Sequence, residues 1–284
     1  MTLALIIQRI NRKLQAYRRL IRYPEQALAA ADNCRAQPAP QVSAAEVDMW
    51  RPELNIAPLR DPDSGKAYDY PETLKRIKYL IAEALTSAVD YITSSRVEGD
   101  ILEFGVGSGW TSAVLSRSMQ HAARRKIHLF DSFQGLPEAE SDVDRDSPMV
   151  KSGIWGRGTC DWGVTPELLK RMLRYEYPSV DVEIYQGWFT ETMDRIPADT
   201  KVAFAHIDCD LYQSTLDVLN HLLSRRMLAK GAILLFDDWT CNQCDPDMGQ
   251  QRAWREATEA FGVRFMDYGF YAHAGRRFIY HGHA

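Results

Sequence analysis

After Gly99, short apolar runs typical of buried strands alternate with segments of helical period, and this alternation most constrains the fold. It implies a mostly parallel sheet covered by helices on both faces. The last two runs have no helix between them and should form an antiparallel pair. We therefore predict an α/β fold with a seven-stranded sheet. The expected strands are Asp100–Gly105, Lys126–Asp131, Val180–Tyr185, Val202–Asp208, Ala232–Asp237, Val263–Asp267 and Arg277–His281, and the expected helices are Trp110–Met119, Pro166–Tyr175, Ser214–Arg225 and Ala253–Phe261.

The chain before this alternation divides into an extension, residues 1–71, and the start of a domain over residues 72–284. In Met1–Arg22, apolar residues recur at helical spacing opposite a face of arginines and lysine, and no acid is present. Such a basic amphipathic helix can pack on the domain, on a second subunit or on an anionic membrane. We favour packing on protein and expect a homo-oligomer. The proline-rich stretch over residues 36–71 predicts a wrapping arm, and Thr73–Ser95 is the first helix of the domain.

The bulk composition narrows the classes of partner. A net charge of −4 gives no reason to expect a nucleic acid as partner. The five cysteines are odd in number and irregularly spaced, which is typical of reduced thiols in a cytoplasmic protein. No apolar run approaches the length that crosses a bilayer, so a membrane partner is not expected.

The loop after the first strand of the domain is rich in glycine and follows an acid. Ligands of open parallel sheets bind beyond the carboxyl ends of the strands. Gly105, Gly107 and Gly109 allow a sharp turn and a close approach to a ligand, although a tight turn alone would also need glycine. Their spacing differs from the pattern that seats a pyrophosphate, and Glu103 would repel one but suits an ammonium or sulfonium group. Asp131 ends the second strand, where an acid can accept both ribose hydroxyls.

Two later strands end in pairs of acids. Asp208 and Asp210 follow one strand, and Asp237 and Asp238 follow the next. Clustered carboxylates repel one another unless they are protonated or neutralised by a cation. Oxygen ligands suit Mg²⁺ or Mn²⁺ better than zinc. We therefore predict a divalent metal site among Asp208, Asp210, Asp237 and Asp238. His206 has the strand parity of Asp208, so it is a candidate base, although a buried structural histidine is the more common outcome.

Two loops have weaker signals. Lys151–Trp162 is glycine-rich and contains two tryptophans, which fits either a lid over an acceptor or a plain surface loop. Cys241 and Cys244 form a single C-x-x-C pair with no second pair to complete a zinc site, and we interpret them as inert thiols.

Four segments, ILEFGVGSGWTS, IHLFDSFQGLPEAESDVD, HIDCDLYQSTLDVL and GAILLFDDW, resemble the macrocin-type O-methyltransferases that modify sugars of natural products. The resemblance extends from about Gly99 to Phe261 and implies the class I methyltransferase (Rossmann-like) fold, S-adenosylmethionine, Mg²⁺ (or Mn²⁺) and a sugar hydroxyl as acceptor. The residues that it assigns to the cofactor are Glu103, Gly105 and Gly107 at the methionine end, Asp131 at the ribose, and Ser132, Gln186, Gly187 and Trp188 at the adenine, together with Ser108 and Asp208. It assigns the metal to Asp208, Asp237 and Asp238.

The chain departs from the family pattern after Gly107, where Ser108-Gly-Trp-Thr replaces an arginine with paired glycines, and after Asp238. Both segments face the acceptor, so a phenol or catechol remains an alternative to a sugar. A dinucleotide-dependent oxidoreductase is a less favoured alternative. In methyl transfer a bound cation would lower the pKa of the acceptor hydroxyl, and Asp208 or Asp210 would accept its proton.

Overall fold

The computed structural model describes residues 57–68, 75–120 and 125–284. The chain divides into two units, Met1–Trp50 and Arg51–Ala284, and the first lies outside the described residues. The predicted basic helix Met1–Arg22 and most of the predicted arm over residues 36–71 therefore also lie outside them. Within the described ranges, no helix is long and apolar enough to cross a membrane.

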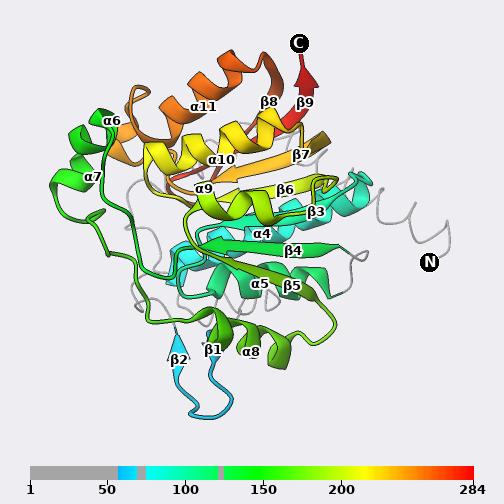
Figure 1. Ribbon diagram of the computed structural model, residues 1–284. Coiled ribbons are helices and arrows are strands. Elements are labelled where there is room, and N and C mark those ends of the chain that lie inside the picture. Colours follow the sequence, from blue (N-terminus) through cyan, green and yellow to red (C-terminus); the bar gives the residue numbers. More distant parts are fainter. Residues whose placement is uncertain (1–56, 69–74, 121–124) are drawn as a thin grey trace, which may run out of the picture. The chain divides into compact units, whose positions relative to one another are not determined.

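The core of the second unit is a seven-stranded sheet with the order β5-β4-β3-β6-β7-β9-β8 (Figure 1). The strands from β5 to β7 are parallel, whereas β9 pairs antiparallel with both β7 and β8. The predicted mostly parallel sheet with an antiparallel final pair is thus confirmed. The strands are β3 Asp100–Phe104, β4 Lys126–Asp131, β5 Asp181–Gln186, β6 Val202–Ile207, β7 Leu228–Phe236, β8 Val263–Tyr271 and β9 Gly275–His283.

Helices cover both faces of this sheet, because neighbouring positions along a strand face opposite sides. In β3, Ile101 belongs to one apolar core and Leu102 and Phe104 to the other. The first core also takes in α4 Lys75–Ser94, α5 Trp110–Met119 and α8 Pro166–Glu176. The second takes in α9 Phe189–Thr192, the short helix η3 Met193–Arg195, α10 Tyr212–Ser224 and α11 Gly249–Ala260. β6 is buried along its whole length, which explains its uninterrupted run of apolar residues and one histidine.

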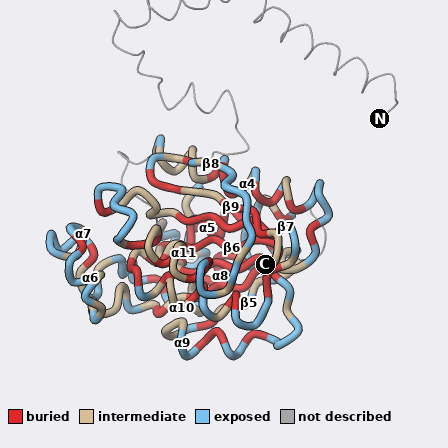
Figure 2. Tube along the Cα trace, turned by 90° about the horizontal axis from the view of Figure 1, so that it is seen from above, coloured by how far each residue is buried: buried red, intermediate tan, exposed pale blue. Residues whose placement is uncertain are grey.

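Several short elements were not predicted. These are the hairpin of β1 Leu59–Arg60 and β2 Ala67–Tyr68, the helices α6 Asp142–Asp146, α7 Pro148–Lys151 and α9, and the short helices η3 and η4 Asn242–Cys244. Hydrophobic period cannot detect helices of one turn, which depend on capping instead. The Ser141 side chain accepts the N–H of Asp144, and the Ser147 side chain accepts those of Met149 and Val150. The segment α6–α7 is largely solvent-accessible, in contrast to the buried strands (Figure 2).

Candidate active site

The turn after β3 is held in shape by a carboxylate from the neighbouring strand. Gly105 has φ 85° and lies so close to β6 that an added Cβ would be 1.8 Å from the carbonyl oxygen of Asp208. Asp131, at the end of β4, accepts the N–H groups of Val106 and Gly107 through Oδ2, at 2.7 and 3.1 Å. Only glycine fits at position 105, and Asp131 has a structural role in addition to the predicted ribose contact.

Glu103 and His206 lie side by side within the sheet. Both side chains are fully buried, with 0% exposed surface, and Nδ1 of His206 is 3.3 Å from Oε1 of Glu103. The hydroxyl of Ser112 donates to the other carboxylate oxygen. Neither residue is among those that line the cavity described below. Within the described residues, the structure therefore places His206 as the partner of Glu103 and away from the cavity in which an acceptor would react.

A cavity of about 570 Å³ opens at the carboxyl ends of β3, β4, β5, β6 and β7. Gly105, Gly107, Asp131, Ser132, Gly187, Trp188 and Asp208 line it, and all were predicted to contact the cofactor. Two other predicted cofactor residues, Ser108 and Gln186, are not among the lining residues. The hydroxyl of Ser108 is buried without a hydrogen-bond partner, and Gln186 is exposed at the end of β5. Most of the residues predicted to contact the cofactor therefore line this one cavity.

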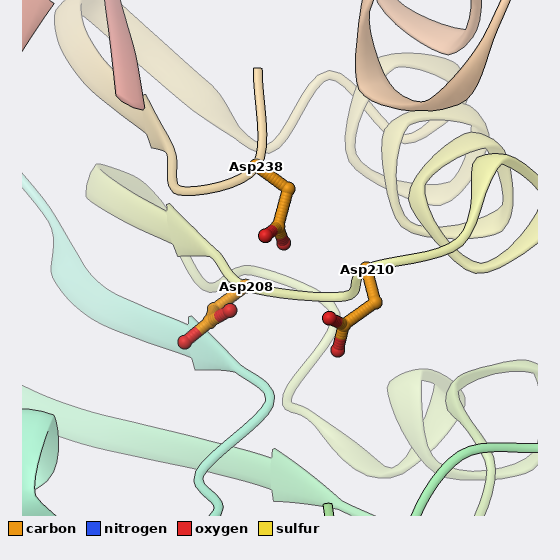
Figure 3. A group of neighbouring side chains, drawn as sticks. All are labelled: Asp208, Asp210 and Asp238. Carbon is orange, nitrogen blue, oxygen red and sulfur yellow. The ribbon is translucent and has the colours of Figure 1, made fainter. Parts of the chain in front are cut away.

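Three carboxylates from two loops meet beside the glycine turn. Asp208 and Asp210 follow β6, and Asp238 follows β7 (Figure 3). One oxygen from each lies within 4.8 Å of the others. The family resemblance placed Asp237 in this group instead of Asp210. In the structure Asp237 lines the cavity, but its Oδ1 accepts the hydroxyl of Tyr271 at 3.0 Å.

The acids of these two loops raise one another's pKa. Burial raises the pKa of Asp208 well above its ordinary value, and Asp237 and Asp238 add to the shift. Burial and Asp238 do the same for Asp210. Burial and Asp237 raise the pKa of Asp238 to about 7. Oδ2 of Asp238 is also buried without a hydrogen-bond partner. A hard divalent cation would offset the repulsion between these carboxylates and coordinate the buried oxygen that has no hydrogen-bond partner.

The sequence missed several lining residues, which lie in a loop or on a helix. Gly135, Leu136 and Glu138 come from the segment after β4, and Gln213 and Asp217 from α10. The segment Lys151–Trp162, whose sequence fits either a lid or a surface loop, contributes Cys160 and Trp162 to the lining, whereas Trp155 is buried. The FDSFQGLP motif was the available signal, but it could not indicate which of its side chains point inward.

The cysteines near the acids are poor nucleophiles. Burial and the charge of Asp210 raise the pKa of Cys160 to about 12. Burial and Asp238 raise the pKa of Cys241, whose Sγ donates to Oδ1 of Asp238 at 3.6 Å. The thiolate is the reactive form. These two thiols are therefore held in their unreactive form, as predicted for Cys241.

The family described as Macrocin-O-methyltransferase (TylF) matches residues 73–263. Three curated relatives are each 29% identical to the chain. The 8-demethyl-8-(2,3-dimethoxy-alpha-L-rhamnosyl)-tetracenomycin-C 4'-O-methyltransferase of Streptomyces olivaceus aligns over 56% of this chain and 60% of its own length. For the demethyldecarbamoylnovobiocin O-methyltransferase of Streptomyces niveus these shares are 68% and 74%. For the mycinamicin III 3''-O-methyltransferase of Micromonospora griseorubida they are 64% and 71%.

Two solved structures share the fold. The O-methyltransferase NovP superposes with a TM-score of 0.60 at 19% identity, over 85% of this chain and 99% of its own. CalS11, a TDP-rhamnose 3'-O-methyltransferase of calicheamicin biosynthesis, superposes with a TM-score of 0.51 at 22% identity, over 84% and 95%. The arrangement of the sheet is therefore that of the class I methyltransferases.

Proposed function

The chain belongs to the macrocin O-methyltransferase family, whose members transfer the methyl group of S-adenosylmethionine, and we propose that it methylates a sugar hydroxyl on a natural-product scaffold with the help of Mg²⁺. The observation that carries the proposal is the group of Asp208, Asp210 and Asp238, of which Asp208 and Asp210 line the same cavity as the glycine turn. Membership of this family removes the oxidoreductase alternative.

The cofactor is proposed to lie along the ends of β3, β4 and β5. The turn at Gly105 and Gly107 leaves room for its methionine end, and Asp131 offers acceptor oxygens toward the ribose. Ser132, Gly187 and Trp188 form the wall for the adenine. Glu103, which is buried under the turn, acts on the cofactor through its charge and through the position of the turn.

The metal is proposed to bind between the two acidic loops. Asp208 and Asp238 are ligands in both the predicted set and the observed group, and Asp237, which lines the cavity, is the third ligand. When bound, a divalent cation lowers the pKa of a coordinated hydroxyl and fixes its oxygen. The donor set fits such an ion, because it offers only oxygen atoms and one of them has no other partner.

Asp210 is proposed as the base that accepts the proton of the acceptor hydroxyl. Its backbone has φ 57°, a left-handed conformation that is uncommon outside glycine and that recurs at functional sites. Burial and the charges of Asp238, Asp237 and Asp131 raise the pKa of Asp210. Asp210 and Asp131 line the same cavity, so the Asp210 carboxylate is accessible to a hydroxyl that binds there.

The charge of the cavity favours a particular class of acceptor. Among the described residues that line it there is no lysine, arginine or histidine. The lining acids are Asp131, Glu138, Glu140, Asp144, Asp208, Asp210, Asp217 and Asp237. A divalent cation and the charged groups of the cofactor offset only part of this charge, and like charges brought together at an interface cost several kcal/mol. A sugar on a neutral or cationic scaffold is therefore favoured over a sugar nucleotide.

The test is transfer of a labelled methyl group from S-adenosylmethionine to a panel of neutral glycosides, amino-sugar glycosides, TDP-sugars and catechols. We expect transfer to a scaffold-bound sugar, loss of turnover with EDTA and recovery with Mg²⁺. Preferred methylation of catechols would replace the sugar acceptor with the phenolic one, and full turnover after removal of metal would exclude the proposed mechanism.

A further inference from the structure

The helix that follows the acidic loop of β6 is capped by a residue from a distant segment. The N-cap position of α10 is Leu211, which offers no side-chain acceptor. Instead, Oδ1 of Asp144 accepts the N–H of Tyr212 at 2.8 Å, and Oδ2 accepts the N–H of Gln213 at 3.1 Å. A carboxylate at a helix N-terminus satisfies free donors and complements the helix dipole. Asp144 is 68 residues away from Tyr212 and supplies the cap that α10 lacks.

The Asp144 side chain is itself fixed in place. It is only 2% exposed, and the hydroxyl of Ser141 donates to its Oδ2 at 2.7 Å. A buried carboxylate with three donors is held rigidly, and it transmits its position to the first turn of α10. That turn begins immediately after Asp210 and Leu211, so Asp144 limits the movement of the proposed base.

A second buried contact joins the same segment to the other acidic loop. The hydroxyl of Ser147, 2% exposed, donates to Oδ1 of Asn242, 4% exposed. Asn242 begins the turn η4, in which Asn242, Gln243 and Cys244 all have positive φ. Cys241, the preceding residue, donates its N–H to the carbonyl oxygen of Asp238 at 3.1 Å. The contact at Ser147 is therefore linked to Asp238 through one tight turn.

We infer that residues 141–152, which we call the clasp, hold the two acidic loops at the spacing that a divalent cation requires. Asp144 fixes the loop of Asp210, and Ser147 fixes the loop of Asp238. Both act as positioning residues, since they are joined to those loops and are not themselves among the clustered acids. The two contacts are three residues apart in a segment whose remaining side chains are partly or fully exposed. This inference rests on the proposed metal-dependent function.

The clasp also connects the metal site with the cavity wall. Asp144 lines the cavity, as do Glu138 and Glu140, which come directly before the clasp. The cofactor turn at Gly105 and Gly107 is instead held by Asp131. Loosening the clasp should therefore disturb the metal site and spare the cofactor site, which separates a positioning role from a general loss of folding.

The experiment measures Mn²⁺ binding by electron paramagnetic resonance and S-adenosylmethionine binding by calorimetry on the full chain. Asp144→Ala and Ser147→Ala are compared with Asp142→Ala, a change of an exposed acid in the same helix α6 whose side chain contacts Arg145. We expect Asp144→Ala to weaken Mn²⁺ binding by about ten-fold, a loss typical of substitutions at residues that orient metal ligands. The affinity for S-adenosylmethionine should not change. Ser147→Ala should weaken Mn²⁺ binding less, because it removes a neutral hydrogen bond, and Asp142→Ala should match the unaltered protein.

Asp144→Asn retains one carboxylate-like oxygen and should recover part of the lost affinity. If Asp144→Ala does not fold, Ser147→Ala and Asp144→Asn decide the question. Equal Mn²⁺ affinity in all folded variants and the unaltered protein would overturn the clasp while leaving the proposed function intact. An unaltered protein that binds S-adenosylmethionine but no Mn²⁺ would overturn the metal-dependent function and the clasp with it.

Discussion

The hydroxyl of Tyr271 donates to Oδ1 of Asp237 at 3.0 Å, across 34 residues of sequence. Burial and the charge of Asp237 raise the pKa of Tyr271, so its hydroxyl keeps the proton that it donates. This bond orients the carboxylate of Asp237, which lines the cavity but is not part of the group formed by Asp208, Asp210 and Asp238. Tyr271 ends β8, so the antiparallel end of the sheet contributes directly to the acidic site.

Tyr271→Phe should weaken metal binding. The substitution keeps the ring and removes only the donor, which leaves Asp237 without the bond that orients it. We expect a loss of about ten-fold in Mg²⁺ affinity, typical of partners behind metal ligands, and about 1 kcal/mol in stability. Tyr268→Phe, at an exposed position of the same strand, is the matched control. Calorimetric titration with Mg²⁺ measures both variants, and unchanged affinity in Tyr271→Phe would show that this hydrogen bond does not position a metal ligand.

The metal-free protein should lose stability as the pH rises from about 5 to 8. Asp238 has a folded-state pKa of about 7, above the ordinary carboxyl value, so the folded state binds more protons than the unfolded state in this window. The stabilisation is present at low pH and is lost as the pH rises through the folded-state pKa. Melting curves in EDTA should show this fall, and added Mg²⁺ should reverse it at pH 8.

Asp238→Asn provides the control for this pH dependence. The amide does not titrate, so the variant should show a flatter dependence and a smaller gain from Mg²⁺. A metal-free protein whose melting temperature rises steadily from pH 5 to 8 would contradict the raised pKa values of the acidic loops.

Gly105→Ala should prevent formation of the cofactor turn. The added Cβ would meet the carbonyl oxygen of Asp208 at 1.8 Å in a conformation with φ 85°. Gly153→Ala is matched in backbone, with φ 78°, but faces open space. We expect Gly153→Ala to cost about 1 kcal/mol, whereas Gly105→Ala should abolish binding of S-adenosylmethionine or prevent folding. Calorimetry and circular dichroism distinguish these two outcomes.

His206→Ala should reduce stability and leave the pH dependence of turnover in place. His206 is fully buried against Glu103, and removing one partner of a buried hydrogen bond costs about 1–3 kcal/mol. Because His206 does not line the cavity, the folded fraction of the variant should keep the shape of the pH–rate profile. If His206→Ala loses one limb of the pH–rate profile, His206 is again a candidate base. Asp210→Asn should lose the limb that reports deprotonation of the proposed base.

The strand and helix pattern was sufficient for the sheet, because the buried strands carry uninterrupted apolar runs and the main helices have a clear apolar face. It also located the acids, since the carboxyl ends of parallel strands share one edge. Sequence could therefore place Asp131, Asp208 and Asp238 at one edge of the sheet, whereas Glu103 is buried within the sheet and does not line the cavity. The short helices α6 and α7 escaped notice because their stability comes from caps and not from a periodic apolar face.

The order of strands and helices, the family and the edge of the sheet that carries the acids can all be recognised in the sequence. Which acids converge depends on side-chain directions and on partners far away in the chain, so the folded structure is needed to see it. Tyr271 donates a hydrogen bond to Asp237, and Asp144 caps the helix that follows Asp210. Glu103 contacts His206 inside the sheet. Local patterns report how a segment folds, whereas hydrogen bonds between distant segments fix the final geometry of the site.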